Sequence, residues 1–301
     1  MSIQATDADP LMAQPRADRL SFATGMLLDA QDFSDEQTYH RGRLARALAF
    51  VAGAGTLAGM EVQHVPGTAT QVEEIRVQPG VVVDRLGRLV ELPRAACLRL
   101  PHWYDATRAV DGGDTRRLSA YADLDRFVSA RMGAGGVVLP ARAVVADVFV
   151  RFAACPRGLS PSFAQGPFDA LNAVSTSRLR DAYELLLIAR TGLDDGYTGL
   201  PLPPAAAAAG DADAPVADRR DALQDAVLHG WEGSGHAGDG GIAPAPEQPR
   251  DLDPSAVFLA RVFLPVDGAT PPARTADAPL VDNWARHFLP PAALFAQWAG
   301  L

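Results

Sequence analysis

The stretch from residue 75 to residue 92 constrains the fold most, because its apolar and polar side chains alternate with a period of two. Residues 75–78 alternate in this way, and after Pro79-Gly80 the run Val81–Val83 continues the apolar pattern. Asp84–Gly87 has the composition of a tight hairpin connection, from which Leu89–Leu92 returns. Paired strands place such a pattern on one face, whereas a helix does not. The stretch therefore predicts a β-hairpin within a sheet.

Two further segments predict strands, and a third is ambiguous. Val144–Phe152 places alternate apolar residues on one face, and we expect the opposite face, with Asp147 and Arg151, to lie near solvent. The apolar run from 255 to 264 predicts a buried strand that ends at a proline. Residues 178–188 fit one face of a helix and equally one face of a strand, so periodicity does not decide between them.

Helices are expected near both ends of the chain. Ser34, with Gln37 three residues later, fits a capping box and predicts the start of a helix that ends by Gly53. Near the C-terminus, Pro290-Pro291 precedes Leu294, Phe295 and Trp298, a pattern typical of an amphipathic helix that begins with proline.

Five residues are expected to shape turns. Gly53 and Gly55 lie in a glycine-rich stretch between the first helix and a strand, which resembles a nucleotide-binding loop in composition but not in order. Such loops run from strand to glycines to helix, so that phosphates meet the helix N-terminus; here the order is reversed, and we expect no nucleotide cofactor. Gly80 and Gly87 supply the backbone geometry of the hairpin, and Asp84 can cap its own turn through a side-chain oxygen.

The chain is expected to form one core with two appended segments. Residues 1–17 are predicted to be a flexible arm, and 18–199 the N-terminal helix plus a β-rich core. Residues 200–254 are rich in Ala, Pro and Gly and predict a mobile insertion with a short helix around 217–228, and 255–301 closes the same core. The expected fold is mainly β (α+β), with a β-sandwich or barrel-like core.

The charge composition excludes several chemistries. All 27 basic residues are arginines, and 36 acidic residues bring the formal net charge to −9. Without lysine there is no P-loop lysine and no Schiff base. The acidic balance also disfavours wrapping of nucleic acid. The N-terminus lacks the pattern of a signal peptide and no apolar run is long enough to span a membrane, so we expect cytoplasmic synthesis. Cys97 and Cys155 are expected first to be buried apolar groups, and the sequence leaves open whether they pair.

No catalytic or metal-binding motif stands out. The six histidines lack the spacing of zinc motifs, and the Gly-x-Ser-x-Gly motif of hydrolases is absent, although a catalytic triad assembled only in space stays open as an alternative. The densest polar and aromatic cluster is His102, Trp103, Tyr104 and Asp105. It fits either a recognition patch for a glycan or a partner loop, or a packed turn between strands.

The order of several motifs resembles a family of bacterial and phage proteins. The segment 19–40 is similar to its opening pattern, Phe-x-x-Gly-x-Leu-Leu-x-x-x-Asp-Phe followed by Glu-Gln-x-Tyr-His. Residues 77–88 match its Val-x-Pro-Gly-x-x-x-Asp-x-x-Gly-Arg pattern, and 177–185 and 281–286 resemble later parts. Met60 stands where the family has leucine. The resemblance favours a strand for 178–188.

The family belongs to phage tails and contractile injection particles, at or near the baseplate. The resemblance therefore implies a non-enzymatic structural component without a cofactor. Its expected partners are other tail or baseplate subunits, and homo-oligomers within the particle, bound through strand edges, the first helix and the C-terminal helix. Release of the particle would carry the protein into the extracellular space. The alternatives are a glycan- or surface-recognition module and a hydrolase.

Overall fold

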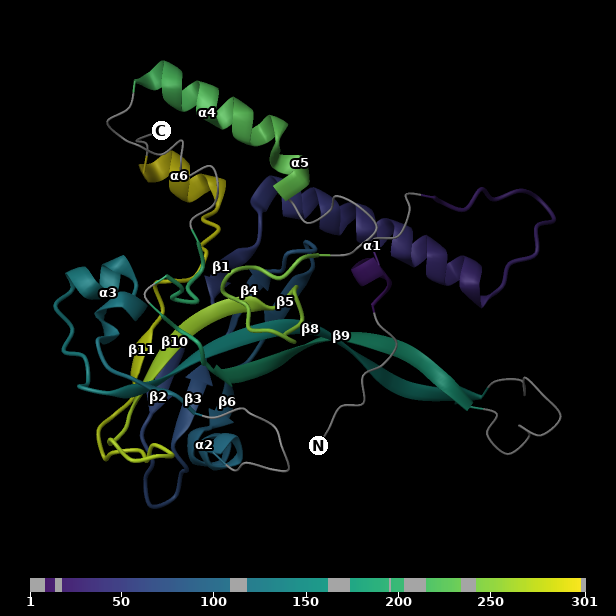
Figure 1. Ribbon diagram of the computed structural model, residues 1–301. Coiled ribbons are helices and arrows are strands. Elements are labelled where there is room, and N and C mark those ends of the chain that lie inside the picture. The colour runs from purple at the N-terminus through teal and green to yellow at the C-terminus, as the bar shows by residue number, and fades with distance from the viewer. Residues whose placement is uncertain are drawn as a thin grey trace.

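The computed structural model describes residues 9–13, 18–108, 118–161, 174–194, 196–202, 215–233 and 242–298. In this part of the chain, antiparallel strands predominate and form three sheets, with a few helices around them (Figure 1). The mainly β character expected from the sequence is thereby confirmed in outline. None of the three sheets closes into a barrel.

The first two sheets are small and come from the first hundred residues. One has the strand order β1-β4-β5 and the other β2-β3-β6. Their strands are β1 (Gly55–Gly59), β2 (Val62–Val65), β3 (Glu74–Val77), β4 (Gly80–Val83), β5 (Leu89–Leu92) and β6 (Ala96–Arg99).

The third sheet is the largest and has β8 and β10 at its centre. Its order is β11-β10-β8-β7, and β9 also pairs with β8. Its strands are β7 (Ala120–Tyr121), β8 (Ala143–Pro161), β9 (Val174–Ala189), β10 (Val257–Pro265) and β11 (Leu280–Asp282). Residues 178–188, which fitted either a helix or a strand, belong to strand β9. Residues from all three sheets, among them Val62, Val82 and Val148, meet in one apolar core.

Helices surround the sheets. They are η1 (Pro10–Ala13), α1 (Ala30–Ala52), α2 (Leu100–Arg108), η2 (Leu124–Phe127), α3 (Ala130–Ala134), α4 (Val216–Leu228), α5 (Gly230–Gly233) and α6 (Ala292–Trp298). The helices expected at 217–228 and after Pro291 are both present. In the described part of the chain, no helix has the length and apolar character needed to cross a membrane.

Helix α1 begins earlier than the sequence predicted. Asp29, not Ser34, is the N-cap: its side chain accepts hydrogen bonds from the amides of Gln31 (2.8 Å) and Asp32 (3.1 Å). The Asp32 carboxylate accepts in return from the Asp29 amide at 2.8 Å, which completes a capping box. The carboxylates of Asp29 and Asp32 accept the hydrogen bonds of the first amides, so the helix begins about one turn before Ser34. It ends at Gly53, whose φ of 81° is in the left-handed region.

The hairpin predicted at 84–87 is confirmed and supports α1. β4 and β5 pair in register from Gly80↔Leu92 to Val83↔Leu89. Gly87 has φ +87°, and a Cβ added there would lie 1.7 Å from the carbonyl oxygen of Ala45. Ala45 is also the only buried residue of α1. The helix therefore contacts the body of the protein where the hairpin turn has no side chain.

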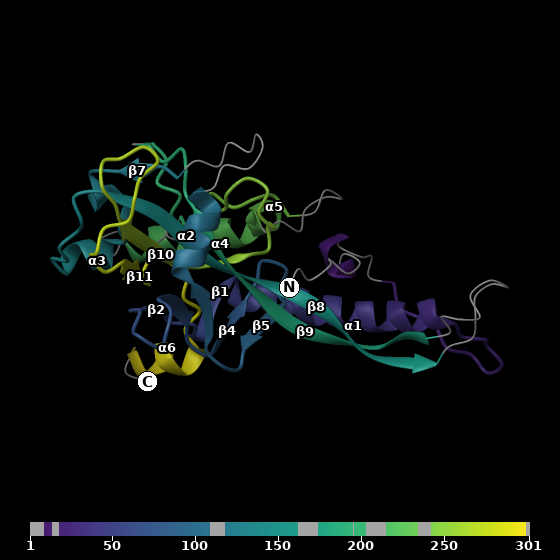
Figure 2. The same cartoon turned by 90° about the horizontal axis from the view of Figure 1, so that it is seen from below.

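β8 and β9 continue beyond the body as a two-stranded ribbon. They stay in one register from Ala146↔Ala189 to Pro161↔Val174. The first half of β8 is buried, whereas its residues 156–161 are exposed. In Figures 1 and 2 the ribbon and the N-terminal half of α1 leave the body toward the same side.

Parts of the two segments expected to be mobile pack against the body. Of the expected arm, Asp9–Ala13 is described, with Leu11 buried against the body. Of the insertion, Trp231 stacks on Phe50 of α1, with 5.8 Å between ring centroids, and Ile242, Glu247 and Gln248 are buried. The five alanines 205–209 and residues 1–8 and 14–17 lie outside the described residues.

Gly87→Ala should destabilise the protein by more than about 3 kcal/mol, because it combines a strained positive φ with a collision against α1. The free energy of unfolding in urea measures this loss. The matched control is Gly136→Ala, which has φ +65° but nothing within 4 Å of the added Cβ, and should lose only about 1 kcal/mol. Equal losses at the two positions would show that α1 does not depend on the turn.

Candidate functional site

A buried group of polar side chains begins at the hairpin turn. Asp84 is fully buried, and its Oδ1 accepts hydrogen bonds from the amides of Leu86 and Arg88, both at 2.9 Å. Its Oδ2 accepts from Nε of Arg88 at 2.7 Å. Burial raises the pKa of Asp84, although the charge and hydrogen bonds of Arg88 oppose this effect. The carboxylate thus fixes its own turn and the following arginine together.

Arg88 carries this junction to three other parts of the chain. Its Nη1 donates to Oδ2 of Asp9 at 2.9 Å, and its Nη2 donates to Oγ of Ser255, also at 2.9 Å. The guanidinium lies 4.6 Å from the ring centroid of Phe152 on β8. Burial lowers the pKa of Arg88, but the charges of Asp84 and Asp9 outweigh it, so the net direction is upward. One arginine therefore connects the hairpin, the N-terminal segment, the approach to β10 and the base of the ribbon.

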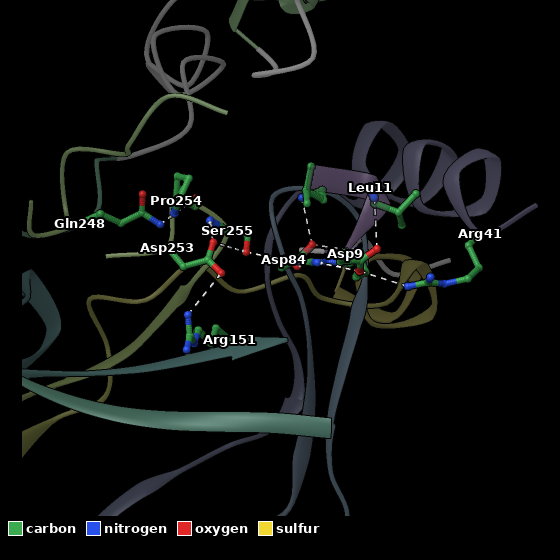
Figure 3. Close-up of polar contacts among 11 residues, drawn as sticks. Asp9, Leu11, Arg41, Asp84, Arg151, Gln248, Asp253, Pro254 and Ser255 are labelled. Atoms are coloured by element: carbon green, nitrogen blue, oxygen red, sulfur yellow. Dashed lines mark hydrogen bonds and ion pairs between the residues drawn. The ribbon is translucent and has the colours of Figure 1, made fainter. Parts of the chain in front are cut away.

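One ion pair and one hydrogen bond extend the junction outward. Asp9 pairs with Arg41 of α1 at 3.1 Å, and Figure 3 shows both residues with Asp84 and Ser255. Burial would raise the pKa of Asp9, but hydrogen bonds from Leu11 and Arg88, with the charge of Arg41, bring it below its usual range. On the other side, Ser255 donates to Asp253 at 2.7 Å.

A second buried ionic cluster lies between β8 and β10. Nε of Arg261 donates to Oδ1 of Asp147 at 2.8 Å, and its Nη2 donates to Oδ2 at 2.9 Å; both side chains are fully buried. Arg190 approaches the same carboxylate at 3.4 Å and donates to the Glu247 carbonyl at 2.6 Å. The prediction that Asp147 faces solvent is therefore wrong. A second layer of the chain covers that face, and two arginines neutralise the carboxylate.

The residues at 282–286 join the C-terminal segment to the small sheets. Both carboxylate oxygens of Asp282 accept hydrogen bonds from Ser129, at 2.6 and 2.8 Å. The amide group of Asn283 exchanges two hydrogen bonds with the backbone of Val62, at 2.9 and 2.8 Å. Arg286 donates to the carbonyl of Met60 at 2.7 Å, and burial lowers the pKa of this arginine to about 10. Each of these side chains holds backbone that is distant in sequence.

The remaining predicted turn glycines are places of close backbone approach. Gly55 has φ +151°, and an added Cβ would lie 2.6 Å from the carbonyl of His287, next to which Thr56 pairs with the C-terminal segment. At Gly80 a Cβ would lie 2.3 Å from the amide of Met60. Gly55 and Gly80 are the first residues of β1 and β4, so the structure places both in strands rather than in turns, where they allow other segments of the backbone to approach closely.

The aromatic cluster at 102–105 is on helix α2, not on a loop or turn. Nε1 of Trp103 donates to the Leu187 carbonyl at 2.6 Å, and the hydroxyl of the buried Tyr104 donates to the Pro272 carbonyl at 3.1 Å. His102 and Asp105 are exposed. The structure thus brings the two aromatic residues together inside the protein and separates them from the two polar ones.

Other titratable groups form smaller contacts. His64 hydrogen-bonds Glu73 at 2.8 Å, and Arg274 donates two hydrogen bonds to the same carboxylate, beside an open pocket of about 360 Å³. Within the described residues, no three His, Cys, Asp or Glu side chains are placed to hold a metal ion. Cys97 and Cys155 are both free thiols, and Cys97 is exposed on β6, contrary to the expectation of burial.

The sequence alone did not predict most of the buried polar contacts described above. Asp9 lay in the expected arm, Arg261 in an apolar run, and Gln248 in the expected mobile insertion, where its amide instead donates to the carbonyls of Pro254 and Ala256. One available signal was the charge itself: a lone arginine within an apolar strand needs a buried partner. No family model matches the chain, and no curated protein matches it either.

Arg261→Met should destabilise the protein by about 3–5 kcal/mol, because it removes both hydrogen bonds of Arg261 to the buried Asp147 carboxylate and leaves it only Arg190 at 3.4 Å. Urea unfolding provides the measurement. The control Arg220→Met removes an exposed arginine that pairs with Asp221 at 2.7 Å, and should cost about 0–1 kcal/mol. A loss at Arg261 as small as that at Arg220 would contradict a structural role of the cluster.

Glu73→Gln should destabilise the protein at about pH 6, and the loss should shrink as the pH falls toward about 3. The hydrogen bonds from Arg274 hold the pKa of Glu73 below its usual range. Its contribution is therefore fully present above the unfolded pKa, about 4.3, and disappears as the pH falls through the lower folded value. Unfolding free energies at several pH values, with exposed Glu91→Gln as control, measure this change. A loss that does not vary with pH would refute it.

Proposed function

We propose that the protein is a non-enzymatic structural subunit of a phage tail or contractile injection particle, at or near its baseplate. The observation that carries the proposal is the use made of the motif residues from which the resemblance was drawn. Asp84, Arg88, Asp282, Asn283 and Arg286 all hold backbone segments together. Because these side chains hold the backbone in place, they support the proposal of a structural subunit rather than an enzyme.

The outer surface supports the same proposal. Helix α1 has 23 residues and one buried side chain, and it presents Leu44 and Val51 to solvent. The ribbon of β8 and β9 has a length for which an isolated pair of strands is only marginally stable in water. Surfaces of this kind gain stability when another protein covers them. We therefore propose that tail or baseplate subunits are the partners and that the protein leaves the cell with the particle.

Purification of particles from a strain that makes them tests the proposal. A tagged full-length protein should co-purify with sheath, tube or spike proteins. The variant Leu44→Asp/Val51→Asp should reduce its incorporation several-fold at unchanged thermal stability, because it places charges on the exposed face of α1. Leu223→Asp/Val227→Asp, on the exposed helix α4, is the matched control. Recovery of the protein alone, from a strain whose particles are intact, would refute the proposal.

A further inference from the structure

The outer half of the ribbon carries three arginines and one carboxylate, Asp181, which as the neighbour of Arg180 lies on the other face, although the chain as a whole is acidic. Arg157, Arg178 and Arg180 are all exposed there, and in the described residues none of them makes an ion pair. Closer to the body the charges are balanced, because Arg151 pairs with Glu184. The exposed Leu159 and Leu179 accompany the three arginines. This basic ribbon tip, defined by Arg157, Arg178 and Arg180, combines positive charge with apolar surface.

The pairing of the strands makes this tip unfavourable in isolation. Arg157 lies directly opposite Arg178, and Cys155 lies opposite Arg180. Residues directly opposite each other share a face of the ribbon, as do residues two apart on one strand, so the three guanidinium groups gather on one face. Like charges that face each other across strands repel. An acidic surface placed on this face would remove the repulsion.

The chain itself carries a surface of the opposite sign. Asp29, Asp32, Asp35 and Glu36 lie at the start of α1, where the described chain between residues 22 and 40 has no arginine. The same part of the chain exposes the apolar side chains of Phe22, Met26, Leu27, Leu28 and Phe33. This acidic helix start thus has the same combination of charge and apolar area as the ribbon tip, with the charge reversed.

The two surfaces do not meet within one molecule but lie on the same side of it. No hydrogen bond or ion pair joins the acidic helix start to the ribbon tip among the described residues. Both project from the body in the same direction (Figures 1 and 2). A two-fold axis at that side would place the ribbon tip of each copy on the helix start of the other, and one contact then generates the reciprocal one.

We propose that the protein forms a reciprocal homodimer in which the ribbon tip of each copy binds the acidic helix start of the other. The partner surface is a second copy of this chain, recognised by paired Arg–carboxylate contacts with apolar side chains beside them. This inference does not rest on membership of a particle, so it is tested with the isolated protein.

Sedimentation velocity of the full-length protein gives the first test. We expect a dimer at about 0.1 M salt whose dissociation constant rises at least ~10-fold at about 1 M, since the Debye length falls from about 10 to about 3 Å. A protein that stays monomeric at low salt, or a dimer indifferent to salt, would overturn the proposal.

Charge reversal gives the sharper test. The ribbon variant Arg157→Glu/Arg178→Glu/Arg180→Glu and the helix variant Asp35→Arg/Glu36→Arg should each be monomeric. The ribbon variant opposes acidic groups to acidic groups at both contacts. The helix variant removes the net negative charge of the helix start, where Asp29 and Asp32 stay acidic, and places two arginines against those of the ribbon. Mixed together they should form a dimer, since one reciprocal contact is then that of the wild type and the other places the new glutamates of the ribbon against the two arginines introduced into the helix. The matched control Arg94→Glu/Arg99→Glu/Arg219→Glu reverses three exposed arginines elsewhere and should dimerise like the wild type.

Circular dichroism melting of each variant verifies that it folds. Variants that fold but dimerise alone, a mixture that stays monomeric, or a control that loses the dimer would each refute the contact. If a charge-reversed variant fails to fold, single reversals at Arg178 and Asp35 replace the sets and follow the same pattern of loss and restoration.

Discussion

The guanidinium of Arg88 joins parts of the chain that lie far apart in the sequence. It binds the turn that precedes it, Asp9 near the N-terminus and Ser255 before β10. A buried charge is tolerated only when its hydrogen bonds are satisfied, so these partners must all be in place at once. The position of the hairpin, the first segment and the central sheet therefore depends on one set of mutually required contacts.

Arginine suits this role better than lysine, and the chain contains no lysine at all. Its planar group offers five donors in fixed directions, so it can bridge a carboxylate and several carbonyls simultaneously. Arg261 does so between β8 and β10, where it binds both oxygens of Asp147 and the carbonyls of Thr198 and Gly199. A buried ion pair adds little net stability compared with an apolar pair. Its effect here is to fix which loops cover the sheet.

The sequence predicted those elements whose causes are local. The alternation and turn residues at 75–92 suffice for the hairpin, and Gly53 suffices to end α1. The burial of Asp147 could not be predicted in the same way, because its partner Arg261 is 114 residues distant. The role of Asp9 could not be predicted either, since its segment has no periodicity and its partners Arg88 and Arg41 are distant in sequence. The composition of 242–254 wrongly predicted a mobile segment. Instead of regular strand pairing, the side chain of Gln248 donates hydrogen bonds to the carbonyls of Pro254 and Ala256.

The interior and the exterior of the molecule differ in how well their polar and apolar groups are satisfied. In the core, buried charges have partners and glycines allow backbones to meet within a few ångströms. On the side where α1 and the ribbon project, the described surface keeps apolar residues in water and arginines opposed to one another. A monomer selected for independent existence would gain by replacing these residues, because exposed apolar area and facing like charges both cost free energy. These residues lie on α1 and the ribbon, which the core holds away from the body. Contacts with other subunits in an assembly would explain why they are exposed, and the core would then fix the direction in which they project.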